Sequence, residues 1–373
     1  MTKLETRILK IRERLKIQNA DALIVLISPN RYYLSGFSSE DHQCDESTGA
    51  LLITADQLIL ATDSRFELQA QQEAPLYRVV VYREGLSKLL PTLAKECGIG
   101  RLCFESIRVS VHQYHELLRE FKNAQIEVEL MPVEDWVEDL RITKSALEID
   151  KTVAALELAE KAFAQMVKQI QPGMTEKQVA WALEKNMREA GAETLSFPSI
   201  IAAGRNGALP HAVPSDRPIE TGEPIIIDWG ARLAGYCSDT TRTIILGDPD
   251  ETFLTVYRTV LEAQQRAIAA IRAGVSTKTV DAVARDYIRE QGFAGKFGHG
   301  LGHGTGLAVH EAPRLSPLKD TILQSGMIVT VEPGIYLSGW GGVRIENQVV
   351  VETDGPRVLN RLKTSYRIEE LAL

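Results

Sequence analysis

The sequence predicts an α+β fold: a smaller N-terminal α/β domain followed by a larger domain made of two similar halves. Up to about residue 130, strand-like segments alternate with helical ones, which indicates a layered α/β domain. Beyond residue 145, two helices and then a β-hairpin occur twice in the same order. We therefore expect an N-terminal domain at 1–131, a linker at 132–144 and a second domain at 145–373.

The N-terminal domain begins with an amphipathic pattern. Residues 3–18 place apolar side chains on one helical face, and residues 22–27 (ALIVLI) are typical of a buried strand. We expect residues 31–37 (RYYLSGF) to be extended, followed by a polar loop at 38–48. Helical and strand-like segments then alternate to about residue 130.

Glycines mark the repeat in the second domain. A capping box at Ser145-x-x-Glu148 opens the first helix, and Gly173 and Gly191 end the two helices of the first half. Two further glycines, 274 and 292, lie 101 residues later in the corresponding positions. This spacing predicts an internal duplication around a pseudo-two-fold axis.

Each half ends in a hairpin that carries two acidic residues. If the first hairpin is symmetric about Leu233 and Ala234, Asp228 faces Asp239, with Cβ atoms roughly 5 Å apart. A second hairpin centred on a glycine-rich turn near residue 339 makes Glu332 face Glu346 in the same way. Four carboxylates at one place would repel each other, so we expect divalent cations between them.

Histidines and glycines alternate between the two hairpins, in FGHGLGHGTGLAVHE at 297–311. A helix with glycine at every second position would lose about 1 kcal/mol per glycine relative to alanine. We therefore expect an extended strand that places His299, Leu301, His303 and Thr305 on one face.

Composition excludes several classes of function. Hydrophobic residues make up 44% of the chain and charged residues 25%, as in ordinary globular proteins. The net charge is −8, without a block of Lys and Arg, which argues against nucleic acid as a partner. The four cysteines form no CxxC pair. Without an apolar signal core or a run of ~20 apolar residues, we expect a cytoplasmic protein with no membrane partner.

Four segments resemble motifs of the methionine aminopeptidase/prolidase superfamily of metallopeptidases, whose fold is called the pita-bread fold. They are IIIDWGARLAGYCSDTTRT, HGLGHGTGLAVHE, GMIVTVEPGIY and GGVRIEN. The resemblance implies five metal ligands, all present here: Asp228, Asp239, His303, Glu332 and Glu346. It also implies that Asp239 and Glu346 bridge two metal ions, that Asp228 completes one site, and that His303 and Glu332 complete the other.

This donor set also indicates the chemistry. Four carboxylates and one imidazole favour hard divalent cations, and we expect Mn²⁺, with Co²⁺, Fe²⁺ or Zn²⁺ as alternatives. Two ions that share a hydroxide supply the nucleophile for hydrolysis of an amide, so no serine or cysteine nucleophile is needed. Glu332 is a candidate to pass a proton to the leaving nitrogen.

The resemblance assigns roles to other residues as well. It implies that His211 and His310 contact the substrate carbonyl or stabilise the tetrahedral intermediate, and that His299 lies nearby. For Arg344, orientation of Asp228 and a purely structural ion pair remain equal interpretations. For Arg314, a contact with the substrate carboxylate and a solvated side chain remain equal interpretations.

Segments 30–37 and 61–70 of the N-terminal domain resemble those of enzymes that cut before proline, whereas loop 38–47 is longer than is usual in that group. We expect an Xaa-Pro aminopeptidase, with an Xaa-Pro dipeptidase (prolidase) as the alternative. A creatinase-like amidinohydrolase and a non-catalytic peptide-binding module are further alternatives, but both predict lost ligands. The resemblance also implies a homodimer, and a peptide substrate with proline at its second position.

Overall fold

The computed structural model describes residues 2–41 and 47–371. It divides the chain into two compact units, Met1–Arg141 and Ile142–Leu373. The stretch expected to be a linker contains the end of strand β6 (Glu129–Val133) and helix α6 (Glu138–Ile142). None of the described helices is long and apolar enough to cross a membrane.

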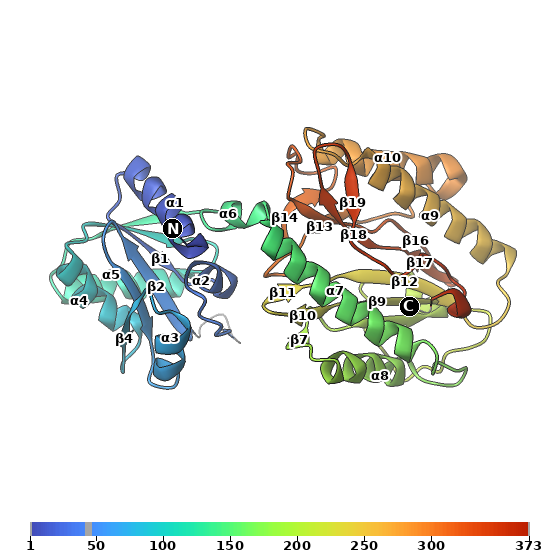
Figure 1. Cartoon of the computed structure of the whole chain (residues 1–373), viewed down its shortest axis with the longest axis horizontal. Helices are drawn as coiled ribbons and strands as arrows, with labels where there is room; N and C mark the ends of the chain where they lie inside the picture. The colour runs from blue at the N-terminus through green and yellow to red at the C-terminus, as the bar shows by residue number, and fades with distance from the viewer. Residues whose placement is uncertain (1, 42–46, 372–373) are drawn as a thin grey trace. The chain divides into compact units, whose positions relative to one another are not determined.

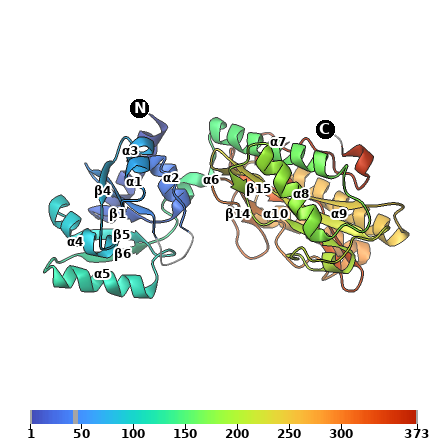
Figure 2. The same cartoon turned by 90° about the horizontal axis from the view of Figure 1, so that it is seen from below.

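The N-terminal unit is a six-stranded mixed sheet in the order β4-β3-β2-β1-β5-β6, in which β2 is antiparallel to both of its neighbours. Its other strands are β1 (Ala22–Val25), β2 (Gly49–Thr54), β3 (Leu58–Thr62), β4 (Arg78–Val81) and β5 (Arg101–Glu105). Figure 2 shows helices on both faces of this sheet. They are α1 (Lys3–Gln18), α2 (Ser28–Ser35) and α3 (Glu67–Glu73) on one face, and α4 (Leu86–Cys97) and α5 (Val111–Asn123) on the other.

The first helix, α1, has the bounds that its pattern predicted. The expectation of an extended segment at 31–37 was wrong, because α2 runs through most of it. Pro29 lies in the first turn of α2, where it needs no amide partner, and Gly36 ends the helix with φ of 89°. Residues 42–46 of the expected polar loop lie outside the described residues.

The C-terminal unit contains the predicted repeat of a helix pair followed by a hairpin. The first half comprises α7 (Ala146–Met166), α8 (Glu176–Glu189), β7 (Thr194–Leu195), β8 (Ile200–Ala203), β9 (Pro224–Trp229), β10 (Ala231–Leu233), β11 (Tyr236–Cys237) and β12 (Thr240–Ile245). The second half comprises α9 (Glu251–Ala270), α10 (Thr277–Ile288), β13 (Gly302–Gly304), β14 (Glu311–Leu315), β15 (Ile328–Val331), β16 (Gly334–Leu337), β17 (Gly341–Arg344), β18 (Asn347–Val351) and β19 (Pro356–Val358). Helices α8 and α10 lie at opposite edges of this unit, with the strands between them (Figure 1).

Backbone detail supports the duplication. The four glycines expected to end helices all adopt positive φ, between 87° and 100°. The Gly173 amide donates to the Ile219 carbonyl, and the Gly274 amide donates to the Leu323 carbonyl in the corresponding place. Each half also buries its own hydrophobic cluster, formed by its helix pair and its strands. The α+β fold with two similar halves is therefore confirmed.

The register of the first hairpin differs from the expected one. Asp228 lies opposite Thr241, two residues beyond Asp239. The cause is the turn: Ala234 and Gly235 both have positive φ, 49° and 78°, as the two central residues of a type I′ turn do. The hairpin is therefore centred one residue later than expected. Because the pairing shifts by two residues, Asp228 and Asp239 still project from the same face.

The register of the second hairpin is the expected one. Val331 pairs with Asn347 on one side, and Gly334 pairs with Arg344 on the other. Between these two ladders the regular pairing is interrupted, and Glu332 and Glu346 lie opposite each other in the interruption. The glycine-rich turn near residue 339 thus predicted the register correctly.

The histidine–glycine segment is not helical; Gly302–Gly304 forms a strand, and the segment ends where strand β14 begins. A Cβ atom at Gly302 would collide with the carbonyl oxygen of Thr330, and one at Gly304 would collide with that of Ala312. These glycines let the strands on either side approach closely. Leu301 packs in the hydrophobic cluster of the second half and does not share a face with the histidines, contrary to expectation.

Candidate active site

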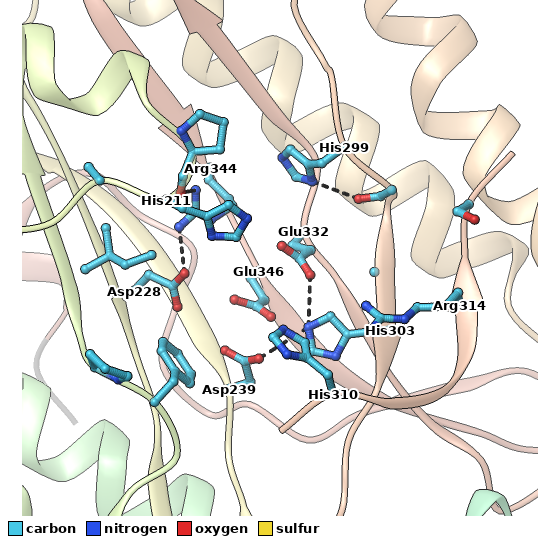
Figure 3. Close-up of a pocket in the computed structure, with 18 of the residues that line it drawn as sticks. His211, Asp228, Asp239, His299, His303, His310, Arg314, Glu332, Arg344 and Glu346 are labelled. Atoms are coloured by element: carbon cyan, nitrogen blue, oxygen red, sulfur yellow. Dashed lines mark hydrogen bonds and ion pairs between the residues drawn. The ribbon is translucent and has the colours of Figure 1, made fainter. Parts of the chain in front are cut away.

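A cavity of about 760 Å³ lies in the C-terminal unit, lined by segments of both halves (Figure 3). All the residues singled out from the sequence line this cavity: His211, Asp228, Asp239, His299, His303, His310, Arg314, Glu332, Arg344 and Glu346. Much of the remaining lining is apolar: Phe197, Pro198, Ile200, Val213, Pro214 and Leu318. The cavity therefore combines one strongly polar region with an apolar wall.

Its polar region centres on a buried histidine among carboxylates. One donor atom each of Asp239, His303 and Glu346 lies within 4.8 Å of the others. His303 Nε2 is 3.5 Å from an Asp239 oxygen and 3.3 Å from a Glu332 oxygen (Figure 3). The other ring nitrogen, Nδ1, is 3.0 Å from the Gly304 carbonyl, which can only accept a hydrogen bond. A proton on Nδ1 leaves the Nε2 lone pair directed at the carboxylates.

Burial changes the ionisation of this group of side chains. It lowers the pKa of His303 to about 3, with a further contribution from His310, so the imidazole is neutral. Burial also raises the pKa of Glu332 to about 7. The pKa values of Asp239 and Glu346 lie well above their usual range, again because of burial and then because of neighbouring carboxylates. A cation between them would reverse this tendency to bind protons.

Two of the carboxylates are held by one oxygen only. Asp228 Oδ2 accepts a hydrogen bond from Arg344 Nη2 at 2.6 Å, and Glu346 Oε2 accepts one from Thr241 Oγ1 at 2.7 Å. The other oxygens, Asp228 Oδ1 and Glu346 Oε1, are buried and have no hydrogen-bond partner in the described part of the chain. Unpaired buried oxygens are costly unless something satisfies them. Together with the neutral imidazole, this donor set fits divalent cations.

Arg344 joins the two hairpins. It is almost fully buried on β17, and besides Asp228 it donates to Thr241 Oγ1, the Pro210 carbonyl and the Tyr336 hydroxyl. The contact with Asp228 agrees with the interpretation that Arg344 orients this carboxylate.

The three other histidines lie around the carboxylates. His299 contacts the Gly300 carbonyl and the Tyr336 hydroxyl through its ring nitrogens, and burial followed by the Arg344 charge lowers its pKa to about 4. The His310 ring lies 4.4 Å from that of His303, and its pKa is lowered by burial and by Arg314. His211 is exposed at the cavity edge.

Arg314 lies on β14, opposite His303 in the strand pairing. It is exposed, and within residues 2–41 and 47–371 it has no ion pair or side-chain hydrogen bond. A guanidinium free of internal partners remains available to an anionic group in the cavity.

Several supporting residues were not identified from the sequence. Thr330 donates to Glu332, Gln348 accepts from the Asp239 amide, and Thr241 holds Glu346. A signal was nevertheless present, because each lies two residues from a predicted ligand on the same strand and therefore on the same face. Tyr336, which contacts both His299 and Arg344, had no such signal.

Comparison with known proteins agrees with this geometry. Residues 150–353 match the model of metallopeptidase family M24, and residues 7–143 match that of the creatinase/prolidase N-terminal domain. The chain therefore belongs to metallopeptidase family M24. Membership of a metallopeptidase family also implies divalent metal ions, and the carboxylates and His303 form a possible site for them.

Individual relatives span nearly the whole chain. An Xaa-Pro dipeptidase of Pyrococcus horikoshii is 36% identical over 95% of this chain and 97% of its own length. An Xaa-Pro dipeptidase from Bacillus anthracis has a similar structure, with a TM-score of 0.90 at 37% identity, covering 97% of this chain and 99% of that one. An X-Pro aminopeptidase from Thermotoga maritima gives a TM-score of 0.85 at 38% identity, covering 94% and 99%.

Proposed function

We propose that this protein is a metal-dependent Xaa-Pro dipeptidase. The observation that carries the proposal is the group of buried carboxylates at the seam of two hairpins, two of which have an oxygen without a hydrogen-bond partner among the residues that the structure describes. Relatives named as Xaa-Pro dipeptidases favour this function over the aminopeptidase that we expected from the sequence. Xaa-Pro aminopeptidase activity becomes an outcome of the test.

The ligands would be Asp228, Asp239, His303, Glu332 and Glu346, holding two divalent ions, for which we propose Mn²⁺. Such ions lower the pKa of a bound water and polarise the scissile carbonyl. Within this arrangement Arg344 and Thr241 orient their carboxylates, and Gly304 holds the tautomer of the histidine.

Other residues would act on the peptide itself. His310 and His211 line the cavity beside the carboxylates and would contact the substrate carbonyl. Glu332 lines the same cavity and would carry a proton to the proline nitrogen, the role of a general acid. The apolar wall would contact the proline ring and exclude water.

Arg314 supports the preference for dipeptides. The proline nitrogen of an Xaa-Pro bond carries no hydrogen, so an enzyme cannot bind this substrate through that amide. The carboxylate that follows proline in a dipeptide offers another handle, and a guanidinium can bind it through two parallel hydrogen bonds. Since Arg314 has no ion pair or side-chain hydrogen bond among the described residues, we assign it this role.

The test compares an Ala-Pro dipeptide with an Ala-Pro-Ala-Ala tetrapeptide as substrates, using protein stripped of metal and then reloaded with Mn²⁺. We expect metal-dependent cleavage with a clear preference for the dipeptide. Arg314→Met should raise the KM for the dipeptide at least about 10-fold, as expected for loss of a charge-assisted contact. Preference for the tetrapeptide would indicate an aminopeptidase. Absence of cleavage with Mn²⁺ bound would overturn the proposed function.

A further inference from the structure

A buried glutamine on α9 lies behind the carboxylate pair of the second hairpin. Gln264 is 1% exposed, and the other buried residues of this helix are hydrophobic except for Thr259. Its Nε2 donates to two carbonyl oxygens, that of Val331 at 3.1 Å and that of Ile345 at 3.0 Å. An amide placed in such surroundings is costly unless it is fully hydrogen-bonded, and one that is satisfied restricts its partners to a single arrangement.

Both carbonyls belong to residues that directly precede a proposed ligand. Val331 comes before Glu332, and Ile345 comes before Glu346. The regular strand pairing is interrupted here, since β15 ends at Val331 and β18 begins at Asn347. The backbone amides of the two glutamates donate to residues outside this hairpin. The Glu332 amide donates to the Leu301 carbonyl, and the Glu346 amide donates to the Thr241 carbonyl. Here the two strands are joined by a long backbone hydrogen bond, 3.5 Å from the Ile345 amide to the Pro333 carbonyl, and by the Gln264 side chain beside it.

In the first hairpin, where the strand is interrupted between β9 and β10, a serine side chain connects the two sides. The Ser238 hydroxyl accepts a hydrogen bond from the Ala231 amide at 2.9 Å and donates to the Ala231 carbonyl at 3.1 Å. Ser238 directly precedes Asp239, so a side-chain bridge lies beside a proposed bridging ligand in this hairpin too. In the second hairpin that bridge comes from a helix, which contacts strands β15, β16 and β17.

We propose that Gln264 is a positioning residue, which sets the separation of Glu332 and Glu346 and thereby the affinity of the site for metal. It touches neither carboxylate and acts through the backbone of the preceding residues. This inference rests on the proposed function, because it takes the two glutamates to be metal ligands.

The test replaces the amide without changing the length of the side chain much. Gln264→Met removes both donors, and Gln265→Met makes the same change at the exposed neighbouring position of the same helix. Titration of metal-free protein with MnCl₂ measures the dissociation constants, and Ala-Pro hydrolysis at saturating Mn²⁺ gives kcat and KM. We expect Gln264→Met to bind Mn²⁺ at least about 10-fold more weakly, because substitution of residues that support metal ligands typically has an effect of this size. The kcat should fall and the KM should stay unchanged. Gln265→Met should match the wild type.

A purely structural role predicts a different result: a lower melting temperature with unchanged Mn²⁺ affinity and kcat, which would overturn the inference. If Gln264→Met does not fold, Gln264→Asn takes its place, because this shorter amide keeps its donors but cannot reach both carbonyls. Wild-type Mn²⁺ affinity in Gln264→Asn would overturn the inference as well. Failure of the wild-type protein and Gln265→Met to bind Mn²⁺ would instead refute the proposed function.

Discussion

The two hairpins of the C-terminal unit each supply two carboxylates, but they hold them differently. In the first, Asp228 sits in a regular ladder opposite Thr241, and Asp239 lies diagonally across from it. In the second, Glu332 and Glu346 face each other in an interruption of the ladder, which Gln264 spans from a helix. The two hairpins therefore have similar topology but use different hydrogen bonds to bring two negatively charged side chains together.

The hairpins also complete each other. Arg344 of the second hairpin holds Asp228 of the first, and Thr241 of the first holds Glu346 of the second. Neither pair of carboxylates is oriented by its own hairpin alone. We expect the site to respond as one unit when either side is changed.

The largest effects should come from the two proposed bridging ligands, one in each hairpin. Asp239→Ala and Glu346→Ala should each reduce turnover at least about 100-fold, because each removes a ligand shared by both ions. Turnover and Mn²⁺ content are measured together. Glu352→Ala, at a half-exposed acidic residue just beyond β18, is the matched control and should have little effect. Near-normal turnover with full metal content in either ligand variant would contradict the assignment.

Loss of the Arg344–Asp228 contact should lower the free energy of unfolding more than loss of the Thr241–Glu346 contact. Arg344→Met leaves the buried Asp228 without its charged partner, a loss that typically costs about 3–5 kcal/mol. Thr241→Val removes the hydroxyl that donates to Glu346 and accepts from Arg344 Nε, and the loss of these contacts is worth about 1–3 kcal/mol. Denaturant unfolding of the metal-free variants should show the larger destabilisation for Arg344→Met. Equal losses would mean that the arginine is not specific to Asp228.

The second hairpin should impose a pH dependence on the stability of metal-free protein. Burial raises the pKa of Glu332 from 4.5 to about 7. The folded state therefore binds the proton more tightly than the unfolded state. The resulting stabilisation is complete below pH 4.5 and is lost as the pH rises through 7. A rise of that size corresponds to about 3 kcal/mol.

Glu332→Gln lacks this titration. Relative to the variant, wild-type protein should thus lose free energy of unfolding between pH 4.5 and pH 7, as measured by urea unfolding at several pH values. Addition of Mn²⁺ should abolish the trend, because a cation favours the ionised carboxylate. A difference between wild type and variant that stays constant with pH would show that Glu332 ionises normally.

The smallest effect concerns the turn that sets the first register. Ala234 has a positive φ, a conformation that costs most residues about 1 kcal/mol but that Asn adopts readily, above all before Gly. Ala234→Asn should raise the free energy of unfolding by about 0.5–1 kcal/mol without changing turnover. Gly235→Ala, the opposite change in the same turn, should lower it. Stabilisation by both substitutions would mean that the turn is not of this type.

The contrast between the hairpins also shows how far the sequence could predict this molecule. Periodicity and glycine spacing were sufficient for the repeat and for the second register, because these depend on local pattern. The first register failed by two residues, since Ala234 carries no signal of the positive φ that it adopts. Helix α2 was missed because its aromatic residues are also typical of strands.

Within the site, the residues proposed as ligands or substrate contacts were predictable from the sequence. The residues that hold them through hydrogen bonds were only partly predictable. Thr241, Thr330 and Gln348 lie two residues from ligands, so alternation along the strand would have indicated them. Gln264 and the contact of Tyr336 with His299 were not predictable, because these partners are set by how elements far apart in the sequence pack together.

The exchange of contacts across the seam makes the halves of this unit mutually dependent. The exposed segment 247–250 connects them, directly before α9. A chain cut there would leave one piece with Asp228 and Asp239, and another with His303, Glu332 and Glu346. Arg344 and Thr241 would be separated from the carboxylates they orient, so neither piece alone would contain the complete set of proposed metal ligands. Two such fragments, each fused to one of two interacting proteins, would form a split reporter whose peptidase signal appears only on reassembly.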